Sequence, residues 1–300
     1  MKFKHLCAGI LASGIGSSGP RNIMAAKCAI ALQSKMMRWK KSSTPFLVAI
    51  VVIKAALAHA ASPTPALPQP TPAARPSIAP QAVEIVQRAC HELSDHNAFT
   101  FHAEVMFDEV LQSGVKLQFA GALDYAVQRP NELAVDYESD LGGKRLWYDG
   151  KTVTLFDIPY KMYASVPASG SIDQMMDHMI EAYHLSLPLG DMASGKACEK
   201  IDQQVNFGTW VGVNDVLGEP CDHLAFALSS ADYQVWVQHA GKPLPRKVVI
   251  NYRALRGSPE YIAFISDWNF PATIPQARFT PNLPQGAERI DFAKAKEQKP

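Results

Sequence analysis

The first 60 residues of this 300-residue chain contain no aspartate or glutamate. They hold nine of the 29 lysines and arginines, so residues 61–300 carry the other 20 together with all 28 acidic residues, a formal charge of −8. Such an acidic body argues against a nucleic-acid binder, which needs a basic face for the phosphates. It also argues against strong attraction to an anionic membrane surface.

The acid-free segment has the order of a secretory signal. Residues 38–41 read Arg-Trp-Lys-Lys, residues 46–57 are apolar except for Lys54, and residues 58–60 read Ala-His-Ala, the small-x-small pattern of a signal peptidase site. The apolar run is too short for a comfortable transmembrane span, although an uncleaved anchor is the alternative. We therefore expect a leader cleaved after Ala60 and a periplasmic mature chain with no transmembrane span.

Four segments follow from this pattern. Residues 1–60 are the leader, in which Met36 or Met37 makes a better start for a signal than Met1. Residues 61–80 contain seven prolines and five alanines, a composition typical of an extended linker. Residues 81–292 are expected to form a single domain, and residues 293–300 a charged tail.

Cysteine is scarce, and the spacings that mark redox or zinc chemistry are absent. The mature part has Cys90, Cys198 and Cys221, with no Cys-x-x-Cys. Cys90 lies on the apolar side of an expected helix. A Cys198–Cys221 disulfide and two buried free thiols are both compatible with an exported chain.

Catalytic motifs are also missing. The chain has no Gly-x-Ser-x-Gly elbow, no His-Glu-x-x-His and no glycine loop followed by a helix, so we expect no enzyme, no metal and no cofactor. Asp177, Glu181 and His184 share one helix face at metal-ligand spacing, but a solvated polar face explains them fully. Cys221 and His223 share a strand face without an evident orienting base, so we do not assign them a catalytic role.

In the body of the chain, residues 81–292, apolar and polar residues alternate with a period of two. Phe99 to Phe107 and Val115 to Val127 place apolar residues on one face and polar residues on the other, and Gln112-Ser113-Gly114 forms the turn between them. Similar runs predict ten or eleven strands in all. A helix opens the body at Pro80, and a second is inserted over Ile172 to Tyr183. The fold class is therefore mainly β (α+β): a strongly curved antiparallel sheet forming a half-open β-barrel capped by helices.

The apolar faces of the two long strands and of the inserted helix predict a hydrophobic concavity. We expect its lining to comprise Phe99, Phe101, Val105, Phe107, Val115, Leu117, Phe119, Leu123, Tyr125, Met176 and Met179. Methionine is adaptable and suits a cover over varied apolar ligands, although ordinary core packing would use the same residues.

Several short motifs occur in an order that resembles the LolA/LolB-like superfamily of periplasmic lipoprotein carriers. More closely, the chain resembles an uncharacterised family of predicted periplasmic proteins related to those carriers. The resemblance covers about residues 80–292. The motifs that carry it are Phe101-His102-Ala103, Arg129-Pro130-Asn131, Asp149-Gly150-Lys151-Thr152, Pro243-Leu244-Pro245-Arg246-Lys247, Asp267-Trp268, Phe279-Thr280-Pro281 and Pro284-Gln285-Gly286-Ala287.

The resemblance implies an apolar concave face that holds acyl chains and an arginine, here Arg129, that hydrogen-bonds the helical cover and gates the cavity. The expected function is therefore non-enzymatic: a periplasmic carrier or binding protein for a lipid, a lipidated ligand or another apolar ligand, acting as a monomer. The alternative is an envelope protein-interaction or sensor module that uses the same fold to recognise a protein.

Overall fold

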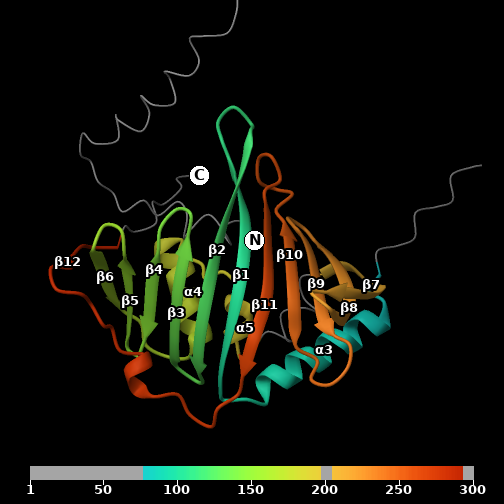
Figure 1. Cartoon of the computed structure of the whole chain (residues 1–300), viewed down its shortest axis with the longest axis horizontal. Coiled ribbons are helices and arrows are strands. Elements are labelled where there is room, and N and C mark those ends of the chain that lie inside the picture. The colour runs from blue at the N-terminus through green and yellow to red at the C-terminus, as the bar shows by residue number, and fades with distance from the viewer. Residues whose placement is uncertain (1–76, 197–204, 293–300) are drawn as a thin grey trace, which may run out of the picture. The chain divides into compact units, whose positions relative to one another are not determined.

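The computed structural model describes residues 77–196 and 205–292 (Figure 1). The helical elements are α3 (Pro80–Ser94), α4 (Ile172–Tyr183), α5 (Gly190–Ala193) and the 3-10 turn η1 (Gln276–Arg278). The strands are β1 (Ala98–Val110), β2 (Lys116–Gln128), β3 (Glu132–Ser139), β4 (Lys144–Tyr148), β5 (Thr152–Asp157), β6 (Met162–Pro167), β7 (Val205–Val216), β8 (Glu219–Leu228), β9 (Asp232–Gln238), β10 (Pro245–Asn251), β11 (Glu260–Asn269) and β12 (Glu288–Arg289).

These twelve strands form one curved sheet in the order β12-β6-β5-β4-β3-β2-β1-β11-β10-β9-β8-β7. The chain starts in the middle with β1, proceeds outward to β6, and returns from the far edge at β7 until β11 pairs with β1. Neighbours are antiparallel except β12 and β6. Because β7 and β12 stand at opposite ends of this order, the sheet remains half-open. The predicted fold class is confirmed.

The first helix forms where its sequence predicts it. Pro80 occupies the first turn, where its missing N–H costs nothing, and the apolar positions at helical spacing are buried: Ala82, Ile85, Val86, Ala89 and Leu93. Cys90 lies half-buried beside this stripe and packs against the main core.

The inserted helix α4 begins at a capping box, in which the Ser171 side chain accepts from the Gln174 backbone and the Gln174 side chain accepts in return. It ends at His184, which adopts the left-handed conformation. Its most buried residues are Ile172, Met175 and Met179, whereas Met176 and Tyr183 are half-buried at the flanks. Of the two methionines expected to line the concavity, Met179 is therefore buried, whereas Met176 lies at the edge of the buried face and Met175 takes its place there.

The two faces of the sheet carry separate cores. The concave face holds the main core, to which α3, α4 and the inner residues of both halves of the sheet contribute. On the convex face, Trp147 and Phe156 form a smaller core that the C-terminal segment covers with Ile274 and Phe279.

The β1–β2 hairpin is longer than its neighbours. β11 pairs with β1 only as far as Phe107, and β3 pairs with β2 only from Gly121 onward. The rest of the hairpin extends past the sheet, as Figure 1 shows.

Candidate functional site

The predicted lining residues of the two long strands divide into a packed majority and an exposed minority. Six are buried, namely Phe99, Phe101, Val105, Phe107, Leu123 and Tyr125, as is Met179 of α4; Phe119 and Met176 are partly buried. The ring centroids of Phe101 and Tyr125 lie 4.6 Å apart, and those of Phe101 and Trp268 lie 4.7 Å apart. Aromatic rings therefore fill this central part of the concave face.

Val115 and Leu117 lie elsewhere. They are 53% and 41% exposed, because they belong to the part of the hairpin that extends past β11 and β3. Alternation continues to the turn, but neither β11 nor β3 pairs with the hairpin there.

A small cavity lies beside the aromatic cluster, under the first half of the sheet. Its volume is about 20 Å³. Its walls are Leu123, Val135, Tyr137, Lys144, Leu146, Leu155, Leu185, Leu187 and Pro188. Among the residues that the sequence nominated, only Leu123 lines it. None of the others was nominated, although the alternation of β3 carries a signal for Val135 and Tyr137.

The size of this cavity decides what it can hold as it stands. A single water molecule needs roughly 10–15 Å³ on this measure. The cavity therefore has room for about one small molecule of that size and none for an acyl chain. An acyl chain can enter only if wall residues move.

One wall of the cavity comes from the segment that links α4 to α5. We call residues 168–195 the cover and residues 185–188, within it, the plug. The plug supplies Leu185, Leu187 and Pro188 to the cavity wall, whereas the other walls come from β2 to β5. Figure 1 shows α4 and α5 behind the strands of this half of the sheet.

Two tyrosines of the sheet hold the cover. The Tyr125 hydroxyl donates to the carbonyl of Pro188 in the plug, and the Tyr148 hydroxyl donates to the carbonyl of Gly170 at 2.7 Å. Burial raises the pKa of both hydroxyls, so they remain donors at neutral pH. The cover also donates a backbone bond from Ile172 to Pro130 at 2.8 Å.

Arg129, which follows β2, connects α3 to the cover. Its guanidinium donates to the carbonyl of Leu93, in the last turn of α3, at 2.6 Å and to that of His96, just after α3, at 2.8 Å. It also donates to the carbonyl of Ser194, after α5, at 3.1 Å. The guanidinium carbon lies 5.1 Å from the centroid of Phe99. A planar fork of five donors suits this set of converging carbonyls, which a lysine could not satisfy in the same way.

The contacts continue from Ser194 into α4. The Ser194 hydroxyl donates to the Asp173 carboxylate, and Gly195 donates its backbone N–H to the same group at 3.1 Å. Asp173 stands in the first turn of α4, where a carboxylate is favoured by the helix dipole. Arg129, Ser194 and Asp173 thus join α3, the end of the cover and α4; we call this set the latch.

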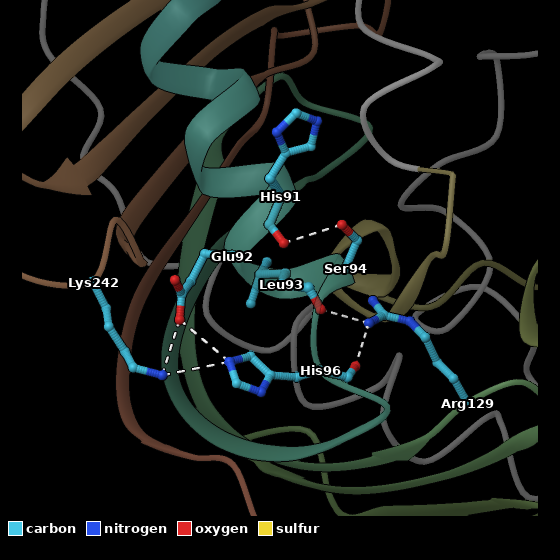
Figure 2. A network of polar contacts seen from close by, with 7 residues as sticks. All are labelled: His91, Glu92, Leu93, Ser94, His96, Arg129 and Lys242. Atoms are coloured by element: carbon cyan, nitrogen blue, oxygen red, sulfur yellow. Dashed lines mark hydrogen bonds and ion pairs between the residues drawn. The ribbon is translucent and has the colours of Figure 1, made fainter.

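A second group of contacts ties the end of α3 to the loop before β10 (Figure 2). Lys242 lies 2.9 Å from the Glu92 carboxylate and 4.4 Å from the centroid of Phe270. His96 lies 3.3 Å from Glu92, and its ring packs against Phe270 at 4.1 Å. The hydrogen bond from Lys242 lowers the pKa of Glu92, so this carboxylate stays ionised at neutral pH.

The remaining chemical candidates do not converge on this site. Within residues 77–196 and 205–292, no group of three or more His, Cys, Asp or Glu residues is placed to hold a metal ion. The Cys221 thiol is buried on the convex face beside Trp236, and burial raises its pKa to about 11, which disfavours the thiolate. His223 stacks on Trp236 with centroids 3.9 Å apart. Cys198, to which a disulfide from Cys221 was one of the two alternatives, lies outside the described residues.

Residues 82–293 match a family model described as Predicted periplasmic protein (DUF2092). The chain belongs to this family. The match spans the folded body from α3 to the end of the described residues and confirms the resemblance found in the sequence motifs. Among the described residues of this DUF2092 protein, no helix has the length and apolar character needed to cross a membrane. A comparison with curated proteins gave no significant match.

Several solved structures resemble the chain at low identity. LprF from Mycobacterium bovis is 14% identical, with a TM-score of 0.42, and the alignment covers 67% of this chain and 98% of LprF. The lipoprotein LppX from Mycobacterium tuberculosis is 13% identical, with a TM-score of 0.42 and coverages of 65% and 99%. A LolA superfamily protein from Nitrosomonas europaea is 11% identical, with a TM-score of 0.35 and coverages of 67% and 97%. At these scores the likeness says nothing about a ligand.

Proposed function

We propose that this DUF2092 protein is a non-enzymatic periplasmic carrier, or binding protein, for a lipid whose alkyl chain enters under the cover. The observation that supports this most directly is the cavity between β2–β5 and the plug. Its walls are apolar except for Lys144, whose ammonium is engaged by Asp157. Apolar walls with few polar groups are typical of sites that bind hydrophobic ligands.

Binding requires the plug to leave the concave face. Exposing two leucines costs about 3–6 kcal/mol, at roughly 1.5–3 kcal/mol for each. Each buried methylene of a ligand contributes about 0.8 kcal/mol. Roughly four to eight methylenes therefore offset the displacement of Leu185 and Leu187, and longer chains bind with a net gain. Net binding should therefore appear only above about eight carbons and strengthen with each further methylene.

Polar contacts hold the cover at several points. Tyr148 holds its start, Tyr125 holds the plug, and Arg129 holds the segment after α5. Backbone bonds from Ala168 to Lys151 and from Ile172 to Pro130 add to them. The cover can therefore open by breaking these polar contacts without breaking a strand pair of the sheet. In this proposal Arg129 has the gating role that its motif predicts.

The experiment is a binding assay of the mature protein with a fluorescent fatty-acyl probe and a chain-length series of competitors. Leu155→Glu places a carboxylate at the cavity wall, on a half-buried strand position that tolerates it better than a fully buried one. We expect probe affinity to fall at least about tenfold. Leu141→Glu is the matched control, since Leu141 is 51% exposed and does not line the cavity. Equal probe binding by both variants and the wild type would contradict the proposal.

The small volume of the cavity favours a second candidate. If the plug never leaves, the concave face is ordinary core, and the protein acts as an envelope interaction or sensor module through its outer surfaces. Absence of probe binding at every chain length, with a folded protein, would favour this candidate over the carrier.

A further inference from the structure

The cavity beside the plug has side chains with polar atoms at one end only. Among its walls these are Tyr137 and Lys144, and the others are leucine, valine and proline side chains. Tyr137 and Lys144 are register partners in β3 and β4, so they lie side by side. An amphiphile whose alkyl chain enters among the apolar walls therefore has its polar head beside these two residues.

The charge of Lys144 is already balanced within the protein. Its ammonium lies 2.5 Å from the carboxylate of Asp157, and the two side chains are only 22% and 7% exposed. Asp157 also accepts the backbone N–H of Tyr160 at 3.3 Å. Separating a pair with so little solvation is costly, because each charge would be left without compensation. Lys144 is therefore not a free cation that an anionic head could bind.

The groups around Tyr137 favour neither sign of charge on a ligand head. Burial is the main cause of the raised pKa of its hydroxyl, Asp140 adds to it, and a hydrogen bond with Ser139 lowers it. The phenol is therefore uncharged at neutral pH. An anionic head at this end would meet the carboxylates of Asp157 and Asp140. A cationic head would meet the ammonium of Lys144, to which it cannot hydrogen-bond.

We propose that the ligand has an uncharged head with hydroxyl or ester oxygens, as in a long-chain alcohol or a monoacylglycerol. This rests on the proposed function, because it assumes that an alkyl chain enters under the plug. A hydroxyl both donates and accepts, so it can bond with the Tyr137 hydroxyl and the Lys144 ammonium and add no charge. An ionised head would be a further charge in a poorly solvated place, which is costly.

The test compares dodecanol, monododecanoylglycerol, dodecanoate and dodecylammonium as competitors of the fluorescent fatty-acyl probe. The assay is run at neutral pH, where the carboxylate and the ammonium are both ionised. The two neutral compounds should displace the probe at concentrations at least about tenfold lower than the two ionised ones. The decisive quantity is the ratio of the dodecanoate and dodecanol affinities. Its change between variants does not depend on the different solubilities of the two compounds in water.

The variant Asp157→Asn leaves Lys144 without its carboxylate and keeps an oxygen that can accept from Tyr160. Dodecanoate affinity should then rise at least about fivefold relative to dodecanol, because the ammonium can pair with the ligand. The double variant Lys144→Gln/Asp157→Asn removes both charges and should keep the preference for dodecanol. Asp177→Asn is the matched control, since it makes the same change in net charge at an exposed position of α4 away from the cavity wall.

The proposal is overturned if either ionised compound competes with the wild type as well as the neutral ones do. It is also overturned if Asp157→Asn folds and changes the affinity ratio no more than Asp177→Asn does. Thermal unfolding shows which variants fold. If Asp157→Asn does not, the order in the wild type and its retention in the double variant decide. A wrong order among compounds that bind contradicts only this proposal, whereas failure of the probe and of all four compounds to bind contradicts the carrier function itself.

Discussion

The guanidinium of Arg129 and the carbonyl of Leu93 lie 2.6 Å apart, although 36 residues separate them in the chain. Leu93 stands at the end of the first helix, and Arg129 at the end of the long second strand. The bond joins the helix that opens the body to the latch that closes the cover, so the stability of the two should be coupled.

Arg129→Met should lower the free energy of unfolding by about 2–4 kcal/mol, because several carbonyls lose a charged donor at once. Arg129→Lys should recover only part of this loss, since an ammonium cannot match the planar fork. Chemical denaturation measures both. Arg88→Met, an exposed arginine of α3, is the control and should stay within about 0.5 kcal/mol of the wild type. A loss no larger than that of the control would show that the latch does not contribute to stability.

Tyr125→Phe should loosen the plug with little change in shape. The variant leaves the Pro188 carbonyl without the hydroxyl that it accepts from, at a cost of about 1–3 kcal/mol. If the plug gates entry, stopped-flow mixing with an acyl probe should show faster association than in the wild type. Tyr160→Phe, at a position 71% exposed, should leave the rate unchanged. Identical association rates in all three proteins would show that the plug does not control ligand entry.

His102 should make stability depend on pH. Its imidazole lies 2.8 Å from Asp124 and 3.2 Å from Glu104, on the convex face. The hydrogen bond with Asp124 is the main cause of a raised pKa of His102, against partial burial, which lowers it. The protonated form is thus favoured in the folded state. Its stabilisation is complete below the ordinary value of 6.5 and is lost as the pH rises through the raised folded value.

The measurement for His102 is the difference in free energy of unfolding between the wild type and His102→Gln. This difference should favour the wild type at about pH 5.5 and shrink by about pH 8.5. The three side chains are partly solvated, so the change should be small. A difference that grows as the pH rises would have the wrong sign for this account.

We expect the leader to be cleaved from the chain during export. If residues 1–60 are a cleaved leader, N-terminal sequencing of the protein from the envelope fraction should begin at Ala61. Protein that stays in the cytoplasm with Met1 in place would contradict this prediction.

The sequence predicted most of the strands because the alternation of apolar and polar residues is long. β1 and β2 have thirteen residues each, long enough for the alternation to define the period and the inward face of both strands. The two-residue strand β12 and the four-residue helix α5 were missed, since neither is long enough to show a period. The partner of β12 is β6, more than 100 residues away, and no local pattern encodes that pairing.

The site was harder to predict than the fold. Alternation identifies which residues face inward. It does not show where other side chains fill the space beside them and where a cavity is left. Phe101 and Tyr125 turned out to stack on each other, whereas the cavity lies under Val135, Leu146 and Leu155. The plug follows α4 without any periodicity. Only Arg129 was nominated for a contact with the helical cover, and it came from a family motif and not from the pattern of its neighbours.

Native mass spectrometry of the protein, isolated from the envelope without detergent, tests the central proposal most directly. The carrier account predicts a species heavier than the apoprotein by one lipid, released by organic extraction and lost in Leu155→Glu but kept in Leu141→Glu. Apoprotein as the only species, combined with no uptake of added fatty acids or phospholipids, would contradict it.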